Sequence, residues 1–296
     1  MTFTAAADVT LAQLRVKLAS SGQWLPVDGD PDEPLGQLVL RNSTGPLRLG
    51  FGAWRDLLLG AQFVNGRGEL ISAGGRVLKN VAGYDLTKLL VGSGGVFGTP
   101  VTVTARTFAL PAGAVHLELP PDPTRVAALL PTPLRPAWAI LRRDRLLLGY
   151  LGDADATSFF AGNALALEPR RIGHASLEAD DALRRAYWPA RPLARAAVPP
   201  AALGTFLTNA CPDGDFSADP AFGVVLLERD DRVDLENARH VAAAVDGHLT
   251  IFDPQSLRPR QVDLDPATYA LLHRLKQAFD PDAALPPLPP NWQNRP

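Results

Sequence analysis

The stretch GGRVLKNVAGYDLTKLLVGSGGVFG, residues 74–98, constrains the fold of this chain more than any other part of its 296 residues. It places seven glycines around one short apolar segment. Glycine lets the main chain approach a ligand closely and adopts backbone conformations that other residues avoid. The stretch therefore predicts either a cofactor cradle or a helix-to-strand turn that needs small residues for close packing.

Two common nucleotide-binding motifs do not fit this stretch. A Rossmann motif needs a strand, then G-x-G-x-x-G, then a helix, but Phe97 stands at the third glycine position. The order is also reversed, because the expected helix over 86–91 precedes the glycines and a β-rich segment over 99–110 follows them. A P-loop needs Gly-Lys-Ser/Thr after its glycines, and none is present here.

Two glycine-containing loops flank the expected helix, NVAGYD over 80–85 and GSGGVFG over 92–98. We expect Asp85 to cap the start of the helix and Gly92 to close its end. Loops of this kind expose backbone N–H groups on both sides of one element, which suits an extended cofactor with a phosphate and a ring.

Bulk composition excludes several classes of protein. A hydrophobic content of 46% supports a buried core, and a net charge of -2 gives no pull toward nucleic acid. Cys211 is the only cysteine, so this chain alone forms neither a disulfide nor a cysteine-ligated cluster. The histidines show no ligand spacing, and we expect no metal site. With no secretory signal and no apolar run long enough to cross a bilayer, we expect a cytoplasmic protein.

Local patterns predict the remaining elements. We expect a strand and a helix before Gly22, a hairpin around Asn65-Gly66, a strand over 99–110 and an amphipathic helix over 265–281. Between 113 and 262 the pattern alternates as β-α-β-β-α-β, an α+β layer with helices on one face, and no internal sequence repeat is evident. The segment LGQLVL, 35–40, is expected to present an apolar face that a partner or a second copy covers.

Residues 74–98 resemble the flavin-binding segment of the FAD-linked oxidases of the vanillyl-alcohol-oxidase type, which have the PCMH-type FAD-binding fold. The upstream sequence TGPLRLGFGAWRDLLLGAQFVNGRGELISAGG resembles the same family, with Arg55-Asp56 and the Asn65-Gly66 hairpin in matching order. Within the family, the chain most resembles the E subunits of bacterial glycolate oxidases, clearly over roughly its first 110 residues. LKQAFDP resembles the C-terminal helix of the family.

This resemblance implies an α+β fold in three parts. The second lobe of a PCMH-type FAD-binding domain covers 1–112, and a ferredoxin-like cap or substrate domain covers 113–262. A C-terminal helix and a proline-rich tail over 263–296 pack back on the FAD lobe. Family members carry a first flavin lobe before this point, and we expect it to be absent from this chain.

The resemblance also implies FAD as the cofactor and a small 2-hydroxy acid, held between the flavin ring and the cap, as the substrate. The implied FAD contacts are Lys79, Asn80, Val81, Ala82, Gly83, Tyr84, Asp85, Gly92, Ser93, Gly94, Gly95, Val96 and Gly98. No residue is singled out as catalytic. The implied partners are a larger FAD subunit and an iron–sulfur subunit of a glycolate-oxidase-like complex, which would also provide any peripheral contact with the inner membrane.

The alternative hypothesis is a flavin-free structural subunit of such a complex. Gln37 stands where the family has the second of two glycines near the flavin, so a side chain replaces a bare backbone. Pro100 removes a backbone donor just after the glycine loop.

A second candidate site lies in the cap, where Arg184, Arg185, Arg191 and Arg195 cluster in sequence. Arginine forks match carboxylates, so a carboxylate site is one interpretation. The other is a solvated helix face on which Asp180-Asp181 pairs with these arginines.

Overall fold

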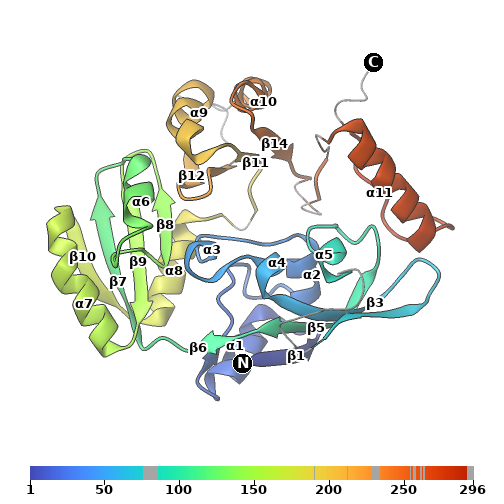
Figure 1. The fold of residues 1–296 in the computed structure, drawn as a ribbon, viewed down its shortest axis with the longest axis horizontal. Coiled ribbons are helices and arrows are strands. Elements are labelled where there is room, and N and C mark those ends of the chain that lie inside the picture. Colours follow the sequence, from blue (N-terminus) through green and yellow to red (C-terminus); the bar gives the residue numbers. More distant parts are fainter. Residues whose placement is uncertain are drawn as a thin grey trace. The chain divides into compact units, whose positions relative to one another are not determined.

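The computed structural model describes residues 1–75, 86–189, 191–211, 213–228, 234–253, 255, 258–260, 262 and 264–291 (Figure 1). The chain forms two compact units. Unit 1 comprises Met1–Gly45, Gly52–Leu110 and Arg258–Pro296, and unit 2 comprises Pro46–Phe51 and Pro111–Leu257.

Unit 1 is built on a four-stranded antiparallel sheet with the strand order β1-β5-β3-β4. Its strands are β1 (Thr2–Ala6), β5 (Thr99–Arg106), β3 (Leu58–Val64) and β4 (Leu70–Gly74). A separate two-stranded sheet pairs β2 (Gln23–Trp24) with β6 (Phe108–Ala109). The predicted hairpin is confirmed as β3–β4. The side-chain oxygen of Asn65 stabilises its turn by accepting hydrogen bonds from the N–H groups of Arg67 and Glu69, both at 3.0 Å.

Helices α1 (Leu11–Ala19) and α2 (Leu35–Leu40) supply much of the core of unit 1. A capping box between Thr10 and Gln13 fixes the start of α1, which agrees with the predicted helix before Gly22. The expected exposed apolar face at 35–40 is wrong. The side chains of Leu35 and Leu38 are fully buried, because α2 turns its leucines and Val39 into the core.

The remaining helices of unit 1 are α4 (Trp54–Leu57), α5 (Thr87–Leu90) and α11 (Pro266–Phe279). The predicted C-terminal helix is confirmed as α11, with Asp265 capping its start. Lys276 on α11 donates to the Val96 carbonyl oxygen at 3.0 Å and also pairs with Asp280. The Phe279 ring stacks on Phe63 with centroids 6.3 Å apart, so α11 packs against β3 and the residues just before β5.

Unit 2 is an eight-stranded antiparallel sheet with helices on both faces. In chain order its elements are α3 (Arg48–Phe51), β7 (Gly113–Leu119), α6 (Thr124–Leu129), β8 (Trp138–Leu141), β9 (Leu146–Gly152), α7 (Ala154–Ala164), η1 (Leu165–Leu167), β10 (Arg171–Ala175), α8 (Leu177–Tyr187), β11 (Ala194–Ala197), η2 (Pro200–Ala202), α9 (Leu203–Ala210), β12 (Phe216–Asp219), β13 (Val224–Leu227), α10 (Leu235–Ala244) and β14 (His248–Ile251).

The predicted ferredoxin-like alternation is confirmed, and it occurs twice. The expectation that the helices cover one face only is wrong, because α8 packs on the other face. The sheet order is β10-β7-β9-β8-β12-β13-β11-β14. The first half contains β7 to β10, and its order from the β10 edge is fourth, first, third and second strand. The second half contains β11 to β14, and counted from the β14 edge its strands lie in the same order. The two halves meet where Ala218 of β12 stands opposite Leu141 of β8. The sequence prediction missed β10 and β12, and this structural repeat leaves no visible sequence repeat.

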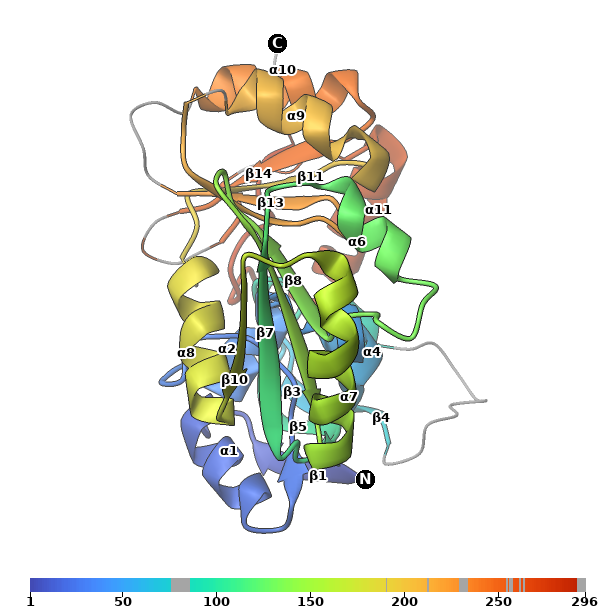
Figure 2. The same cartoon turned by 90° about the vertical axis from the view of Figure 1, so that its left-hand side faces the viewer.

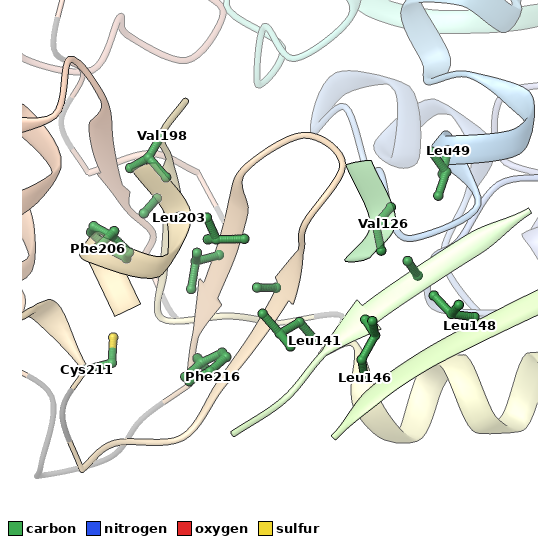
Figure 3. Close-up of a cluster of buried hydrophobic side chains, with 14 of the residues drawn as sticks. Leu49, Val126, Leu141, Leu146, Leu148, Val198, Leu203, Phe206, Cys211 and Phe216 are labelled. Atoms are coloured by element: carbon green, nitrogen blue, oxygen red, sulfur yellow. The ribbon is translucent and has the colours of Figure 1, made fainter. Parts of the chain in front are cut away.

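The core of unit 2 lies on one face of this sheet. Helices α9 and α10 lie side by side over β11 and β14, while α7 covers β7 and β9 (Figure 2). Leu203, Phe206 and Phe216 meet Leu141 in this core, which continues to Leu148 (Figure 3). Helix α8 packs on the other face, against β7 and β10.

Two glycines of unit 2 give a matched test of this packing. A methyl group at Gly149 on β9 would overlap the buried indole of Trp138, whereas a methyl group at Gly162 on α7 meets no atom within 4 Å. We predict that Gly149→Ala lowers the free energy of unfolding by about 2–3 kcal/mol through overpacking. Gly162→Ala should raise it by about 0.5–1 kcal/mol through helix propensity.

Urea unfolding followed by circular dichroism measures both effects. Equal stabilities for the two variants would contradict the placement of Trp138 against β9.

Candidate functional site

The glycine turn, residues 92–98, connects α5 to β5 in unit 1. Gly92, Gly94 and Gly95 have φ angles of +77°, +63° and +86°, a region that residues with a side chain rarely adopt. Gly92 follows Val91, the C-cap residue of α5, and its left-handed backbone agrees with its predicted role in closing the helix. The turn therefore requires its glycines for its own backbone path.

Every backbone N–H group from residue 92 to residue 96 already has an acceptor within unit 1. In chain order, the acceptors are the carbonyl oxygens of Val39, Leu90 and Leu40, the Oγ of Ser93 and the carbonyl oxygen of Ser93, at 2.8–3.3 Å. A phosphate group needs donors that are still available. In this conformation, these five groups hold the turn together and do not form a phosphate cradle.

The second half of the glycine turn faces the core. Val96 and Phe97 are buried, and Phe97 meets the Phe279 ring of α11 edge-on at 6.1 Å. The backbone at Gly98 lies close to Phe63, leaving no room for a side chain. Of the residues expected to contact FAD, Val96 thus turns its side chain into the protein interior.

The other expected contacts, Lys79, Asn80, Val81, Ala82, Gly83, Tyr84 and Asp85, lie outside the described residues, and so does the expected helix cap at Asp85. The structure brings together only the six contacts of the glycine turn, 92–96 and 98.

Asn42 was missed by the sequence analysis. It adopts a left-handed conformation, with φ +48°, just after α2, and a methyl group on Gly92 would lie 3.3 Å from its Cβ atom. Its side-chain oxygen is buried and accepts no hydrogen bond from any described residue. Leaving a buried acceptor unpaired costs about 1–3 kcal/mol, so this atom is a marked position for a ligand donor. The only signal in the sequence was the turn-forming run RNSTG.

These observations decide how far unit 1 fits FAD. Among the described residues, a methyl group on Gly94 would meet only a side-chain carbon of Arg258, at 3.8 Å, so a ligand can approach the main chain closely at this point. The Asn42 oxygen suits an O–H or N–H donor, which FAD offers on its ribityl chain and rings. Because the N–H groups of residues 92–96 are already paired, the described part of the glycine turn fits an uncharged part of the cofactor and does not fit its pyrophosphate.

A buried polar network joins α8 to the sheet of unit 2. Asp180, 1% exposed, accepts the indole N–H of Trp138 at 2.9 Å and lies 2.8 Å from Nε2 of His116. Arg184, one turn further along α8, forms an ion pair with the same carboxylate. Burial, and secondarily Arg184, lowers the pKa of His116 to about 4, so its imidazole is neutral at pH 7.

The four arginines of the second candidate site separate in the structure. Arg184 and Arg185 pair with Asp181 at 3.2 Å, as the helix-face interpretation expects, and Arg191 is exposed. The expectation that this helix face is solvated is wrong for Arg184 and Asp180, because both are buried. Arg195 lies on strand β11 and not on helix α8, which carries Arg184 and Arg185.

The described part of the chain contains no group of three or more His, Cys, Asp or Glu side chains placed to hold a metal ion. Within the same ranges, none of the helices combines the length and apolar character needed to cross a membrane.

The structural comparison identifies the fold. Alkyldihydroxyacetonephosphate synthase superposes on 96% of this chain with a TM-score of 0.65 and 15% sequence identity, and the match covers 64% of that protein. This similarity extends over both units and is that of a PCMH-type FAD-binding fold. No protein-family model matches the chain.

Sequence comparison adds the relatives. The chain is 33% identical to glycolate oxidase subunit GlcE of Escherichia coli over 121 residues, which are 40% of this chain and 35% of GlcE. It is 38% identical to subunit GlcD of Bacillus subtilis over 92 residues, 30% of this chain and 19% of GlcD. It is 30% identical to a mitochondrial D-lactate dehydrogenase of Arabidopsis thaliana over 103 residues, 35% of this chain and 18% of that enzyme.

The chain is therefore related to the FAD-linked oxidases and has their PCMH-type FAD-binding fold. Two of the relatives are named as subunits of glycolate oxidase. The matched segments span about a third or less of these curated relatives, so they relate this chain to part of each protein.

The low pKa of His116 predicts a pH dependence of stability. In the unfolded chain a histidine takes up its proton near pH 6.5, whereas folded His116 does so only near pH 4. As pH falls through this window the unfolded state binds more protons, so the free energy of unfolding decreases, by up to about 3 kcal/mol. Urea unfolding at several pH values measures the decrease, which should be smaller in His116→Gln. The same pH dependence in both proteins would contradict a neutral buried imidazole.

Removing the carboxylate of Asp180 should be strongly destabilising. Asp180→Ala leaves the buried Arg184 guanidinium without its main partner and the Trp138 indole without an acceptor. We predict a loss of about 3–5 kcal/mol in the free energy of unfolding. Glu178→Ala, an exposed position on the same helix, is the control and should remain close to the unaltered chain. A small effect at Asp180 would show that the network is not needed for folding.

Proposed function

We propose that this chain is an FAD-binding subunit of an oxidoreductase that oxidises a small 2-hydroxy acid within a multi-subunit, glycolate-oxidase-like complex. The observation that carries the proposal is the 33% identity to a glycolate oxidase subunit over 121 residues. Relatives named as D-lactate and D-2-hydroxyglutarate dehydrogenases support a hydroxy acid as the substrate class. The PCMH-type fold supports FAD as the cofactor.

In this proposal the bound flavin supplies the redox chemistry, by taking up the electrons of the hydroxy acid. The chain's own residues bind and orient the cofactor. The Asn42 oxygen would accept a hydrogen bond from the cofactor, and the bare backbone at Gly94 would allow its close approach. The proposal assigns the remaining FAD contacts to residues 79–85, as the family resemblance implies.

Partners complete the proposal. Cys211 is the only cysteine of the chain and is buried, so an iron–sulfur cluster belongs to another subunit. A larger FAD subunit and an iron–sulfur subunit therefore carry the electrons onward. The proposal also includes the cytoplasmic location that the sequence led us to expect.

A specific observation favours a second candidate, the flavin-free structural subunit. The five N–H groups from residue 92 to residue 96 are already paired within unit 1. A pyrophosphate draws about 1.5–3 kcal/mol from each charge-assisted hydrogen bond, and these donors provide none of it. The structural subunit would keep the PCMH-type fold and use it to hold the complex together.

The visible absorption spectrum separates the two candidates. It is recorded for the purified chain alone, after incubation with FAD and desalting, and after co-expression with the larger flavin subunit and the iron–sulfur subunit. Flavin retained in a 1:1 ratio by this chain supports the first candidate. A chain that stays colourless under all three conditions contradicts it and leaves the structural subunit.

A substitution at Asn42 tests where the flavin lies. Asn42→Gly keeps the left-handed backbone and removes a buried acceptor that has no donor among the described residues, so the protein should fold as before. We predict that its affinity for FAD falls by about tenfold, the equivalent of one lost hydrogen bond.

The control for this substitution is Asp246→Gly, which changes an exposed left-handed residue of unit 2. Fluorescence titration with FAD should give this control the affinity of the unaltered chain. Equal affinities for all three proteins would place the flavin away from Asn42.

A further inference from the structure

The outward side of helix α7 in unit 2 is apolar and exposed. Two large side chains stand on it, Phe159, which is 46% exposed, and Leu165 of η1, which is 67% exposed. The other exposed positions beside them are small, at Ser158, Gly162 and Ala166. Asp155 is the only charged residue between 154 and 167. A surface helix normally carries charged and polar side chains on its outer side, so this surface is unusual.

Two other helices of the same unit show the usual pattern. Helix α8 pairs the exposed Arg185 with Asp181 at 3.2 Å, and helix α10 pairs Arg239 with Glu236 at 2.9 Å. Both helices lie on the same sheet as α7 (Figure 2). The apolar outer side of α7 is therefore not a general consequence of covering this sheet.

The core of unit 2 is filled by the inward side of α7. Phe160 places its ring 4.7 Å from that of Tyr150, and Ala164 is fully buried. Phe159 meets the Phe160 ring edge-on, with centroids 5.6 Å apart, and nevertheless remains nearly half exposed. Covering Phe159 and Leu165 would remove apolar area from water, which is favourable. Their exposure therefore suits contact with another protein.

The two ends of α7 carry opposite charges. The first turn is acidic, because Asp153, which caps the helix, and Asp155 are both exposed. At the other end, Arg125 of α6 donates to the last carbonyl oxygen of η1 at 2.9 Å. Arg170 is exposed there and also donates to a backbone carbonyl in the β8–β9 turn at 3.0 Å. These two arginines outweigh the single acid at this end, Glu168, so the second end is basic.

This pattern is complementary to itself. When two copies of α7 cross antiparallel about a two-fold axis at Gly162, the acidic end of each copy lies beside the basic end of the other. Phe159 of one copy then meets Leu165 of the other, because both lie three positions from Gly162. A methyl group on Gly162 meets no atom within 4 Å, so the axis is open to close approach. A different protein would need the same pattern in reverse, whereas a second copy presents it by symmetry.

We propose that the outer side of α7 and η1 is the interface of a symmetric dimer, in which a second copy of this chain covers it. Phe159 and Leu165 form its apolar centre, and Asp155 pairs with Arg170 of the other copy at both ends. One pair of helices covers less than the roughly 1,200–2,000 Å² of a standard interface, so we expect a dissociation constant of about 10–100 µM. This inference goes beyond the proposed function and does not rest on it.

Sedimentation equilibrium of the purified full chain, between about 5 and 500 µM, measures the association. Phe159→Glu and Leu165→Glu should each raise the dissociation constant by about 100-fold or more, because each substitution places a charge from both copies in the apolar centre. Val16→Glu is the matched control. Val16 is 75% exposed on α1 of unit 1, so this variant should dimerise like the unaltered chain. Circular dichroism should show that all three variants are folded.

Exchanging the charges at the ends of α7 keeps the test independent of the apolar substitutions. Asp155→Lys and Arg170→Glu should each weaken the dimer by about 5- to 30-fold, through repulsion at both ends. The double variant should return to within about threefold of the unaltered chain, because the opposite charges again face each other across the interface. A purely structural effect of either substitution would not be reversed by the other.

Cross-linking tests the position of the two-fold axis. Gly162→Cys places a thiol of each copy at the axis, where a disulfide needs Cα atoms about 4.4–6.8 Å apart. The native Cys211 is 1% exposed and does not compete. Under mild oxidation this variant should form a covalent dimer on a non-reducing gel. Val16→Cys, the control with an exposed thiol in unit 1, should stay largely monomeric on the gel.

A chain that stays monomeric at 500 µM, about tenfold above the expected dissociation constant, would overturn the proposal. So would a dimer that Phe159→Glu leaves intact, or equal cross-linking of Gly162→Cys and Val16→Cys. A monomer that instead binds the co-expressed larger flavin subunit, and loses it in Phe159→Glu, would assign this surface to that subunit and also overturn the proposal. The association is measured without flavin, so its failure leaves FAD binding by unit 1 open.

Discussion

The carbonyl groups at the end of α2 determine the structure of the glycine turn. Val39 and Leu40 accept the N–H groups of Gly92 and Gly94 at 3.0 and 2.8 Å, which fastens the turn to a helix whose side chains fill the core of unit 1. The same attachment places Asn42, the second residue after α2, directly beside Gly92. From the other end of the turn, Lys276 of α11 holds the Val96 carbonyl oxygen. The turn is thus fixed at both ends, and its donors are used to fix it.

The elements with strong local signals could be predicted from the sequence. Alternating and β-branched residues indicated β3, β4 and β5, and the turn at Asn65 joined the first two. Strands β10 and β12 were missed because RIGHA and FSAD are short and become strands only through pairing with β7 and β13. The duplicated strand order of unit 2 is likewise a property of pairing between distant segments, which local propensity does not encode.

The candidate site could be predicted only in part for a similar reason. The sequence showed that the turn over 92–98 is rich in glycine. It did not show whether the backbone N–H groups of the turn are available to a ligand or already donate hydrogen bonds within the protein. Whether the N–H groups of the turn are available depends on α2, a helix some fifty positions earlier in the chain, and no local pattern reveals it. Asn42 was missed for the same reason, since it becomes distinctive through a neighbour that is distant in sequence, Gly92, and through the lack of a donor among the described residues.

The two units use buried polar groups in different ways. In unit 2, Asp180 collects donors from Arg184, Trp138 and His116, and the network is closed within the protein. In unit 1, the Asn42 side-chain oxygen is incomplete, because it accepts no hydrogen bond from any described residue. Complete networks define the fold, whereas incomplete ones indicate where a ligand would be bound.

The most direct test of the central claim is an FAD titration of the ¹⁵N-labelled chain followed by amide NMR. Binding in unit 1 predicts saturable shifts of the Asn42 side-chain and Gly94 resonances, while Gly162 on α7 of unit 2 stays unchanged. Unchanged resonances throughout unit 1 at millimolar FAD would contradict the assignment of this chain as a flavin-binding subunit.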